Sequence, residues 1–308
     1  MLRFHFAQGH MGSPCRIVLY APDAQSAQAA AAAAFAEIAA IDASMSDFKP
    51  ESELSRLNQS GEGVVSDRLF EVLSIALRIA EATDGAFDPM LGAAVGVWRE
   101  GRIPSEEERK EILSKVGWRH LRLDPAKRRA RIDKPGVRLD LGGIAKGYAA
   151  DRALAALARK GVISALVAVA GDISLGDPPP GAEAWRVSIG GEGSGILLLR
   201  NRGVSTSGDA ERFLEIGGVR YSHVLDPRTG VGLPGGAQAT VVAPNATLAD
   251  ALATAACVLG PEAGIEVAAS VPGVEARVQS GDWERETAGF ASLLLPGAGD
   301  LSRPSDGR

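Results

Sequence analysis

The sequence contains few of the residues that build disulfide frameworks, thiolate metal sites and aromatic cores. Its 308 residues include 2 cysteines and 4 histidines, and only 5% are aromatic. Cys15 and Cys257 lie far apart in the chain, which indicates neither a disulfide framework nor a metal-thiolate pattern. The scattered histidines likewise disfavour a histidine-rich zinc site.

Several catalytic signatures are also missing. The chain has no G-x-G-x-x-G after a predicted strand, no Gly-Lys pair and hence no phosphate-binding P-loop, no H-E-x-x-H and no G-x-S-x-G. These absences argue against Rossmann dehydrogenases, P-loop kinases, zincins and serine hydrolases. The formal net charge is -5, and Lys and Arg are scattered among acids, so we expect no nucleic-acid partner.

No apolar stretch reaches membrane-spanning length without charges. Arg3, His5 and Gln8 interrupt the first ten residues, so these lack the apolar core of a signal peptide, and no lipid-attachment box precedes Cys15. We therefore expect a cytoplasmic protein. A chain from which a leader had been removed would start in the same way, which leaves a periplasmic or membrane-anchored location open.

What is present is a chain that is 45% hydrophobic, enough to bury a large core. Apolar spacing and Gly or Pro stops predict helices at residues 24–43, 67–83, 144–159 and 247–259, the last capped by Thr247 and ended by Gly260, with short helices starting near Ser52 and within 104–117. Strands are predicted at 120–124, 129–133, 137–141, 164–177, 185–190, 195–200, 219–226 and 239–244. The basic cluster Lys127–Arg131 is interpreted as a hairpin tip, and 85–98 as too rich in glycine for regular structure.

Strands and helices do not alternate regularly, which favours an α+β fold with mixed or antiparallel sheets and flanking helices. We expect residues 1–294 to form a single domain, or two closely packed subdomains, and residues 295–308 to be a disordered tail.

The stretch VRLDLGGIAKGYAAD, Val137 to Asp151, combines an acid, two glycines and a lysine around a predicted strand-to-helix turn. Gly142 and Gly143 would let a ligand approach the backbone, and the helix start would direct N–H groups at an anion such as a diphosphate. Lys146 could neutralise a phosphate, and Asp140 could accept hydrogen bonds from a sugar or base. The alternative is an ordinary tight turn with solvated charges.

Two further motifs carry candidate chemistry. Asp250 and Thr254 are four residues apart, so on a helix they share a face and offer two hard oxygens to Mg²⁺. Alternatively, Thr254 packs within the helix and Asp250 serves the helix start. His223 precedes a Pro-Arg-Thr-Gly turn, where its imidazole could project into a site or be a structural histidine. The hydroxyl-rich stretch VSTSGD, residues 204–209, is ambiguous by itself.

Together these motifs resemble the ApbE-type flavin transferases, which are FAD:protein FMN transferases. The resemblance follows the family's order through Met11-Gly12-Ser13, SDFKPESELSRLN, DGAFDP, LDLGGIAKGYAAD, VAGDI, STSGD, YSHVLDPRTG and ADALATA, most of the chain up to about Leu295. It implies an ApbE-like, T-fold-like architecture. It also implies Mg²⁺-dependent transfer of FMN from FAD to a threonine hydroxyl of an acceptor protein, with release of AMP. Such an acceptor could be a flavin-dependent redox protein or a membrane electron-transport subunit.

The resemblance also implies roles for individual residues. The FAD site would be formed by Met11, Phe48, Ala86, Phe87, Asp88, Asp140, Lys146 and Val224. The metal would be held by Gly143, Asp250 and Thr254. His223 would assist deprotonation of the incoming threonine, with Asp250 as the competing candidate. Two other functions remain open at this stage: hydrolysis of FAD to FMN and AMP, and FAD binding without turnover.

Overall fold

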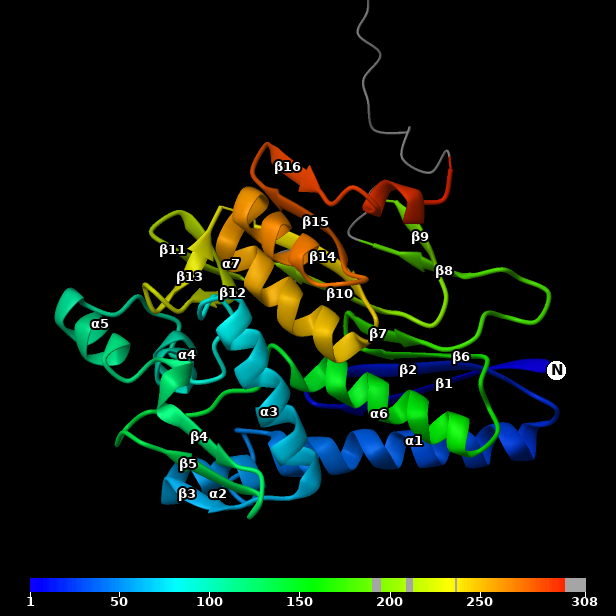
Figure 1. Ribbon diagram of the computed structural model, residues 1–308, viewed down its shortest axis with the longest axis horizontal. Helices are drawn as coiled ribbons and strands as arrows, with labels where there is room; N and C mark the ends of the chain where they lie inside the picture. Colours follow the sequence, from blue (N-terminus) through cyan, green and yellow to red (C-terminus); the bar gives the residue numbers. More distant parts are fainter. Residues whose placement is uncertain (190–194, 209–212, 236, 297–308) are drawn as a thin grey trace, which may run out of the picture.

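A computed structural model describes residues 1–189, 195–208, 213–235 and 237–296, and is built around one large sheet (Figure 1). The sheet has eight strands in the order β1-β2-β6-β7-β10-β14-β15-β16, and every neighbouring pair is antiparallel. Its strands are β1 (Leu2–His10), β2 (Ser13–Ala21), β6 (Ala165–Val169), β7 (Asp172–Leu175), β10 (Gly203–Gly208), β14 (Gln238–Ala243), β15 (Glu275–Ser280) and β16 (Trp283–Glu286).

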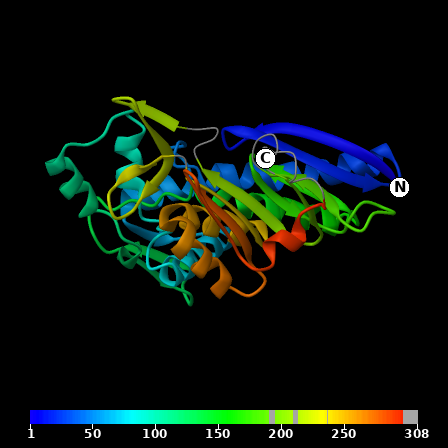
Figure 2. The same ribbon diagram turned by 90° about the horizontal axis from the view of Figure 1, so that it is seen from above.

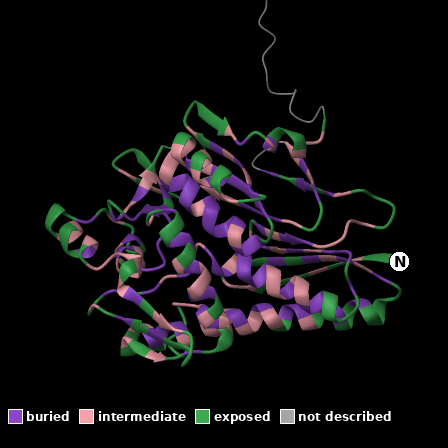
Figure 3. Cartoon of the chain, in the orientation of Figure 1, coloured by how far each residue is buried: buried purple, intermediate pink, exposed green. Residues whose placement is uncertain are grey.

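Both faces of this sheet carry apolar side chains, because residues alternate sides along each strand. In β2, Cys15, Ile17 and Leu19 join the main core, whereas Val18 and Tyr20 pack on a second cluster across the sheet. Buried residues accordingly run through the middle of the molecule in Figure 3.

Three long helices pack on the main-core face: α1 (Ala24–Met45), α6 (Ala145–Arg159) and α7 (Ala246–Ser270). Alanine supplies high helix propensity in α1, and the Asp23 side chain caps its first turn by accepting the Ser26 N–H at 2.7 Å. The opposite face is covered in part by the hairpin of β8 (Trp185–Ser188) and β9 (Ile196–Leu199) and by the 3₁₀ helix η2 (Phe290–Leu293).

The remaining elements form smaller units around the sheet. Helices α2 (Glu53–Ser60) and α3 (Asp67–Ala82) and the 3₁₀ helix η1 (Trp118–His120) adjoin the sheet of β3 (Glu62–Val64), β5 (Arg129–Ile132) and β4 (Leu121–Asp124). Another three-stranded sheet contains β11 (Phe213–Ile216), β12 (Val219–Asp226) and β13 (Val231–Pro234). Figure 2 shows α4 (Gly92–Trp98) and α5 (Glu106–Leu113) at the end of the molecule opposite the N-terminus.

By length and composition α7 could cross a membrane, but half of its most apolar window is buried inside the molecule. Gly260 has a φ of 78°, which kinks the helix immediately before Pro261. The apolar character of α7 is therefore accounted for by its position in the core.

The α+β class and most predicted helices and strands are confirmed, but several predictions are wrong. Residues 164–177 form two strands, β6 and β7, with a turn at Ala170, where φ is 53°, and Gly171. The cap of α7 is Asn245, not Thr247, and the helix continues past Gly260 in a kinked form. Within the basic cluster, Arg129 to Arg131 belong to β5, so only its first two residues lie in the hairpin turn.

Two further errors lie close to the candidate site. Residues 137–141 form no regular secondary structure and pair with no strand in the part of the chain that the structure describes. Residues 92–98 form α4 despite their glycines. In the predicted tail, residues 297–308 lie outside the described residues, and the domain limit at residue 294 stays a prediction.

Candidate active site

The site is organised by the close crossing of α6 and α7. A Cβ at Gly147 would lie 2.2 Å from the Ala246 carbonyl oxygen and 2.8 Å from the Asp250 Cβ. Because Gly147 has no side chain, the two helices approach backbone to backbone, and the Gly147 N–H donates to Asp250 Oδ2 at 3.0 Å. The packing of the core therefore fixes the position of the Asp250 carboxylate.

The predicted metal ligands come together at this crossing. A Cβ at Gly143 would lie 3.0 Å from Thr254 Oγ1 and 3.4 Å from Phe87 Cε2, so the Gly143 backbone lies against both side chains. Asp250 and Thr254 are one turn apart on α7, and the Thr254 hydroxyl is 3.4 Å from the Ser207 hydroxyl. Gly143 precedes α6, whose N-cap residue, Ile144, provides no side-chain cap.

These groups fit a hard divalent cation. The Asp250 side chain is 2% exposed, and burial, followed by the nearby Asp172 charge, raises its pKa above the ordinary aspartate value. A buried carboxylate in this state gains from a cation beside it. No group of three or more His, Cys, Asp or Glu suits a metal within the described ranges, so a metal here would depend on one carboxylate and neutral oxygens. Mg²⁺ accepts such a set when water and substrate phosphates complete it.

Lys146 lies between two buried acids. Its Nζ is 2.5 Å from Asp172 Oδ2 and 3.8 Å from Asp250 Oδ2. Asp172 also accepts the Ser205 hydroxyl on its other oxygen at 2.5 Å, so it links β7 to β10. The ammonium group that the sequence assigns to a phosphate is thus already paired with a carboxylate.

Asp140 is engaged by protein groups on both oxygens. Oδ1 accepts the Gly142 N–H at 2.7 Å, and Oδ2 lies 3.3 Å from Nη2 of Arg99. Burial raises the pKa of Asp140, and these two donors act in the opposite direction. Phe48 is 74% exposed and lies under the Arg99 guanidinium, 4.2 Å from ring centroid to Cζ. Arg99 therefore joins two predicted FAD-site residues.

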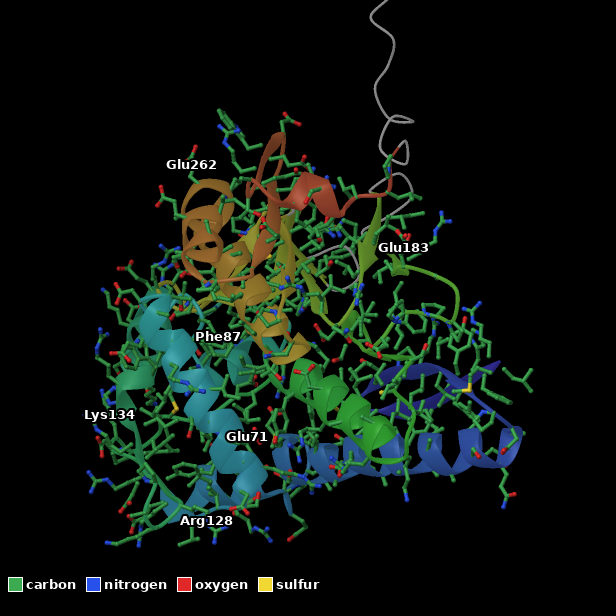
Figure 4. All side chains as sticks on the ribbon, turned by 45° about the vertical axis from the view of Figure 1, so that its right-hand side comes forward. Glu71, Phe87, Arg128, Lys134, Glu183 and Glu262 are labelled. Carbon is green, nitrogen blue, oxygen red and sulfur yellow. The ribbon has the colours of Figure 1, made fainter. Side chains whose placement is uncertain are left out.

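The Ala86–Asp88 segment is buried beneath the site. Phe87 is central in Figure 4, in contrast to the peripheral Arg128 and Lys134. Asp88 accepts the Met90 and Trp118 N–H groups at 2.7 and 2.9 Å, so its carboxyl braces the backbone. Burial raises the pKa of Asp88 to about 6.

Met11 lies in the two-residue turn between β1 and β2. Both Met11 and Gly12 have positive φ angles, 53° and 66°, as the twist of a tight hairpin requires. Ala170 donates its N–H to the Pro14 carbonyl at 3.1 Å. The turn therefore lies at the same end of the strands as the start of β7, which carries Asp172. Such a left-handed conformation is uncommon for methionine.

His223 lies on β12 at an irregularity. The pairing of β12 with β13 shifts register between Tyr221 and Leu225, and His223 is exposed whereas its neighbour Val224 is buried in the main core. Bulges of this kind redirect side chains and are frequent beside active sites. β12 contacts both α7 and β10, which places its strand next to the elements that hold Thr254 and Ser207.

A groove of about 890 Å³ lies elsewhere, between α3, α6, β7 and the start of α7. None of the predicted site residues line it. One lining residue, Asp151, accepts the Ala246 and Thr247 N–H groups at 2.9 and 2.8 Å and so anchors the start of α7. The candidate site is therefore defined by the predicted site residues around the α6–α7 crossing, and the groove is a separate cavity.

Sequence reasoning missed Asp172, Ser205 and Arg99 as site residues. Asp172 and Ser205 fall inside quoted motifs, VAGDI and STSGD, and a polar residue inside a buried apolar run was an available signal. Arg99 has no comparable signal, because its partners lie about 40 and 50 residues away in the chain. Asp209 of the second motif lies outside the described residues.

Solved structures share this architecture. The ApbE protein from Thermotoga maritima superposes with a TM-score of 0.87 at 29% identity, covering 96% of this chain and all of that one (100%). The flavinyl transferase ApbE from Pseudomonas stutzeri, in its apo form, gives a TM-score of 0.84 at 28% identity, covering 95% and 97%. The ApbE fold therefore extends over nearly the whole chain.

Sequence comparisons agree. The model of the ApbE family matches residues 11–278. A Treponema pallidum (strain Nichols) protein named FAD:protein FMN transferase is 38% identical over 255 residues, 74% of this chain and 70% of its own length. An Escherichia coli (strain K12) protein of the same name is 31% identical over 275 residues, 83% and 78% of the two chains. The chain belongs to the ApbE family.

Proposed function

We propose that this chain is a Mg²⁺-dependent FAD:protein FMN transferase that attaches FMN to a threonine hydroxyl of an acceptor protein and releases AMP. The threonine oxygen forms a bond to the FMN phosphorus, and the bond from that phosphorus to the bridging oxygen of the diphosphate breaks. The hydroxyl proton passes to a base on the enzyme, and AMP leaves with the bridging oxygen.

One observation carries the proposal: in a chain of this family, the Gly143 backbone lies against Thr254 Oγ1, one turn of α7 away from the buried Asp250. Gly143, Asp250 and Thr254 would hold the cation. When bound, Mg²⁺ supplies neutralisation of charge on the diphosphate. An FAD-binding protein without turnover has no need of such a cation site.

The other residues would position the reactants. The diphosphate would lie at the glycine turn before α6, near the positive end of the helix dipole, where the Ala145 and Gly147 N–H groups already donate to the Leu141 carbonyl and to Asp250 Oδ2. The exposed Phe48 ring offers a face for stacking an aromatic ring of FAD. His223, redirected at the β12 irregularity, would accept the threonine proton, and the Lys146–Asp172 pair would hold the Asp250 carboxylate in place.

The test incubates the full chain with FAD, Mg²⁺ and an acceptor protein modified by one of the relatives, beside that acceptor's Thr→Ala variant. We expect covalent flavin on the threonine-bearing acceptor only, seen by mass spectrometry and in-gel fluorescence, with AMP in equal amount. Free FMN and AMP with either acceptor would indicate hydrolysis instead. Unchanged FAD would indicate a binding protein.

Matched variants separate the site from general charge effects. Asp250→Asn should reduce transfer at least about 100-fold, because a metal-ion or electrostatic contribution of several kcal/mol is lost. Asp84→Asn removes an aspartate whose side chain is 93% exposed and should leave transfer unchanged. Full activity of Asp250→Asn, or of the wild type in excess EDTA, would contradict the metal assignment.

A further inference from the structure

Arg99 makes contact with three partners through different parts of one guanidinium group. Its Cζ lies over the Phe48 ring, 4.2 Å from the centroid. Nη1 pairs with Asp47, and Nη2 lies 3.3 Å from Asp140 Oδ2. Arg99 therefore ties the loop between α1 and α2 to the turn that precedes Gly142 and Gly143.

Only arginine suits this arrangement. A planar guanidinium can stack by its face while its edge donates to two separate carboxylates. A lysine ammonium would keep the charge but could not combine stacking with two fixed hydrogen bonds. The side chain is 40% exposed, so the contacts are partly shielded from water.

The backbone of Arg99 is itself anchored. The preceding residue, Trp98, is 6% exposed and packs edge-on against Tyr221 of β12, with ring centroids 6.0 Å apart. A Cβ at Gly232 of β13 would lie 2.5 Å from Trp98 Cζ2, so the indole fills all available space. The strand that carries His223 and the Phe48 loop thus meet at two successive residues.

We propose that Arg99 is a positioning residue for FAD, an inference that rests on the proposed function. By occupying one face of Phe48 and holding that ring against the Asp140–Gly143 turn, it leaves the other face for an aromatic ring of the dinucleotide. The 74% exposure of Phe48 is consistent with an open second face. Arg99 also balances Asp47 and Asp140, two carboxylates whose charge would otherwise repel a diphosphate.

The chain offers a matched control. Arg119 lies over Trp118, with Cζ 4.4 Å from the ring centroid, and pairs with the exposed Asp84 at 3.6 Å, which reproduces the arginine, aromatic ring and aspartate with side-chain partners that are not predicted site residues. Substitution of Arg119 by lysine tests the cost of losing such a contact in general. The variants compared are Arg99→Lys, Arg99→Gln and Arg119→Lys.

Steady-state FMN transfer, with FAD varied at saturating Mg²⁺ and acceptor, is the main measurement. We expect both Arg99 variants to raise KM for FAD about tenfold with kcat within about twofold, since binding is lost without loss of chemistry. Arg119→Lys should match the wild type. The effects of Arg99→Gln and Phe48→Leu on KM should be far from additive, because both remove the same stack.

Hydrogen exchange of residues 46–52 in the free protein gives a second readout that needs no turnover. Arg99→Gln should accelerate exchange there and Arg119→Lys should not. An unchanged KM and unchanged exchange in Arg99→Lys and Arg99→Gln overturn the positioning role, as do parallel losses of kcat and thermal stability. A wild-type protein that binds no FAD overturns the proposed function as well, so the two failures are distinguishable.

Discussion

Lys146 and Asp172 form an ion pair whose two sides differ in exposure, 29% for the lysine side chain and 4% for the aspartate. The carboxylate is fixed by Ser205, and the ammonium lies 3.8 Å from Asp250. Within the described residues, the ammonium thus has Asp172 as a close partner and lies near a second carboxylate that is predicted to bind metal. To bind a phosphate, the Lys146 ammonium would have to contact it while remaining paired with Asp172.

This arrangement predicts strong coupling between the two residues. Asp172→Asn leaves the lysine without its close partner, and Lys146→Met leaves a buried aspartate uncompensated, so each should lower the free energy of unfolding by about 1–3 kcal/mol. The double variant should lose clearly less than the sum. Urea unfolding of all four proteins measures the coupling, and strict additivity would contradict it.

Thr254 should affect metal use through its hydroxyl alone. Thr254→Val retains the shape but removes Oγ1, so we expect the Mg²⁺ concentration for half-maximal transfer to rise about tenfold or more, on the scale seen for altered metal surroundings. Thr254→Ser keeps the hydroxyl and should stay within about threefold of wild type. Magnesium titrations of the transfer rate decide between them, and equal behaviour of the two variants would remove Thr254 from the metal site.

His223 should influence the chemical step more than FAD binding. His223→Gln should lower kcat about 100-fold or more, because general base catalysis contributes on that scale, with little change in KM for FAD. His5→Gln, an exposed histidine on β1, is the control and should be silent. A parallel loss of FAD affinity would make His223 a binding residue.

The raised pKa of Asp88 predicts that the free energy of unfolding depends on pH. Its folded pKa of about 6 lies above the ordinary aspartate value of 3.8 because the carboxyl is buried. The folded state therefore binds the proton more tightly, so this contribution to stability is full below pH 3.8 and is lost as pH rises through about 6. Relative to Asp88→Asn, the wild type should lose about 3 kcal/mol of unfolding free energy over that range. Denaturant unfolding at several pH values measures this difference, and a flat difference would contradict the assignment.

Regular helices were predictable because local signals agree with the packing. Residues 24–45 combine alanine with an aspartate cap, and residues 67–82 keep one apolar face. The pairing of Asp250 with Thr254 followed from helical spacing alone. Their meeting with Gly143 could not be derived from spacing, because it depends on the packing of α6 on α7.

The wrong strand at residues 137–141 has a clear physical cause. Val137, Leu139 and Leu141 are buried and alternate with exposed or partly exposed residues, which is the pattern of a half-buried strand. The Leu139 backbone, however, bonds to the Asn58 side chain at 2.7 and 3.0 Å and not to a neighbouring strand. The flanking Arg138 C=O and Asp140 N–H bond to the backbones of Gly92 and Pro89, which belong to no strand. The alternation therefore reflects burial, and the hydrogen bonds of this segment go to a side-chain amide and a non-strand segment.

The helix at residues 92–98 was missed because glycine lowers helix propensity. The absence of a side chain at Gly92 lets α4 pack closely against Arg138, because a Cβ there would lie 2.9 Å from both the Arg138 Cβ and the Arg138 carbonyl oxygen. Long-range packing overrides local propensity at this position. The same contact holds the start of α4 against the segment that leads to Asp140, and Arg99 at the other end of this short helix reaches the Asp140 carboxylate.

The missing side chain at Gly147 has a consequence for engineering. The oxygens of Asp250 and Thr254 lie on a helix packed backbone to backbone against its neighbour, so any residue larger than glycine at position 147 would separate the two helices. Phe48 and Arg99 lie outside the helical core and are partly exposed, so these positions should tolerate the substitutions needed to change dinucleotide preference. Libraries that vary positions 47, 48 and 99 while leaving 147 untouched should yield folded proteins with altered cofactor choice.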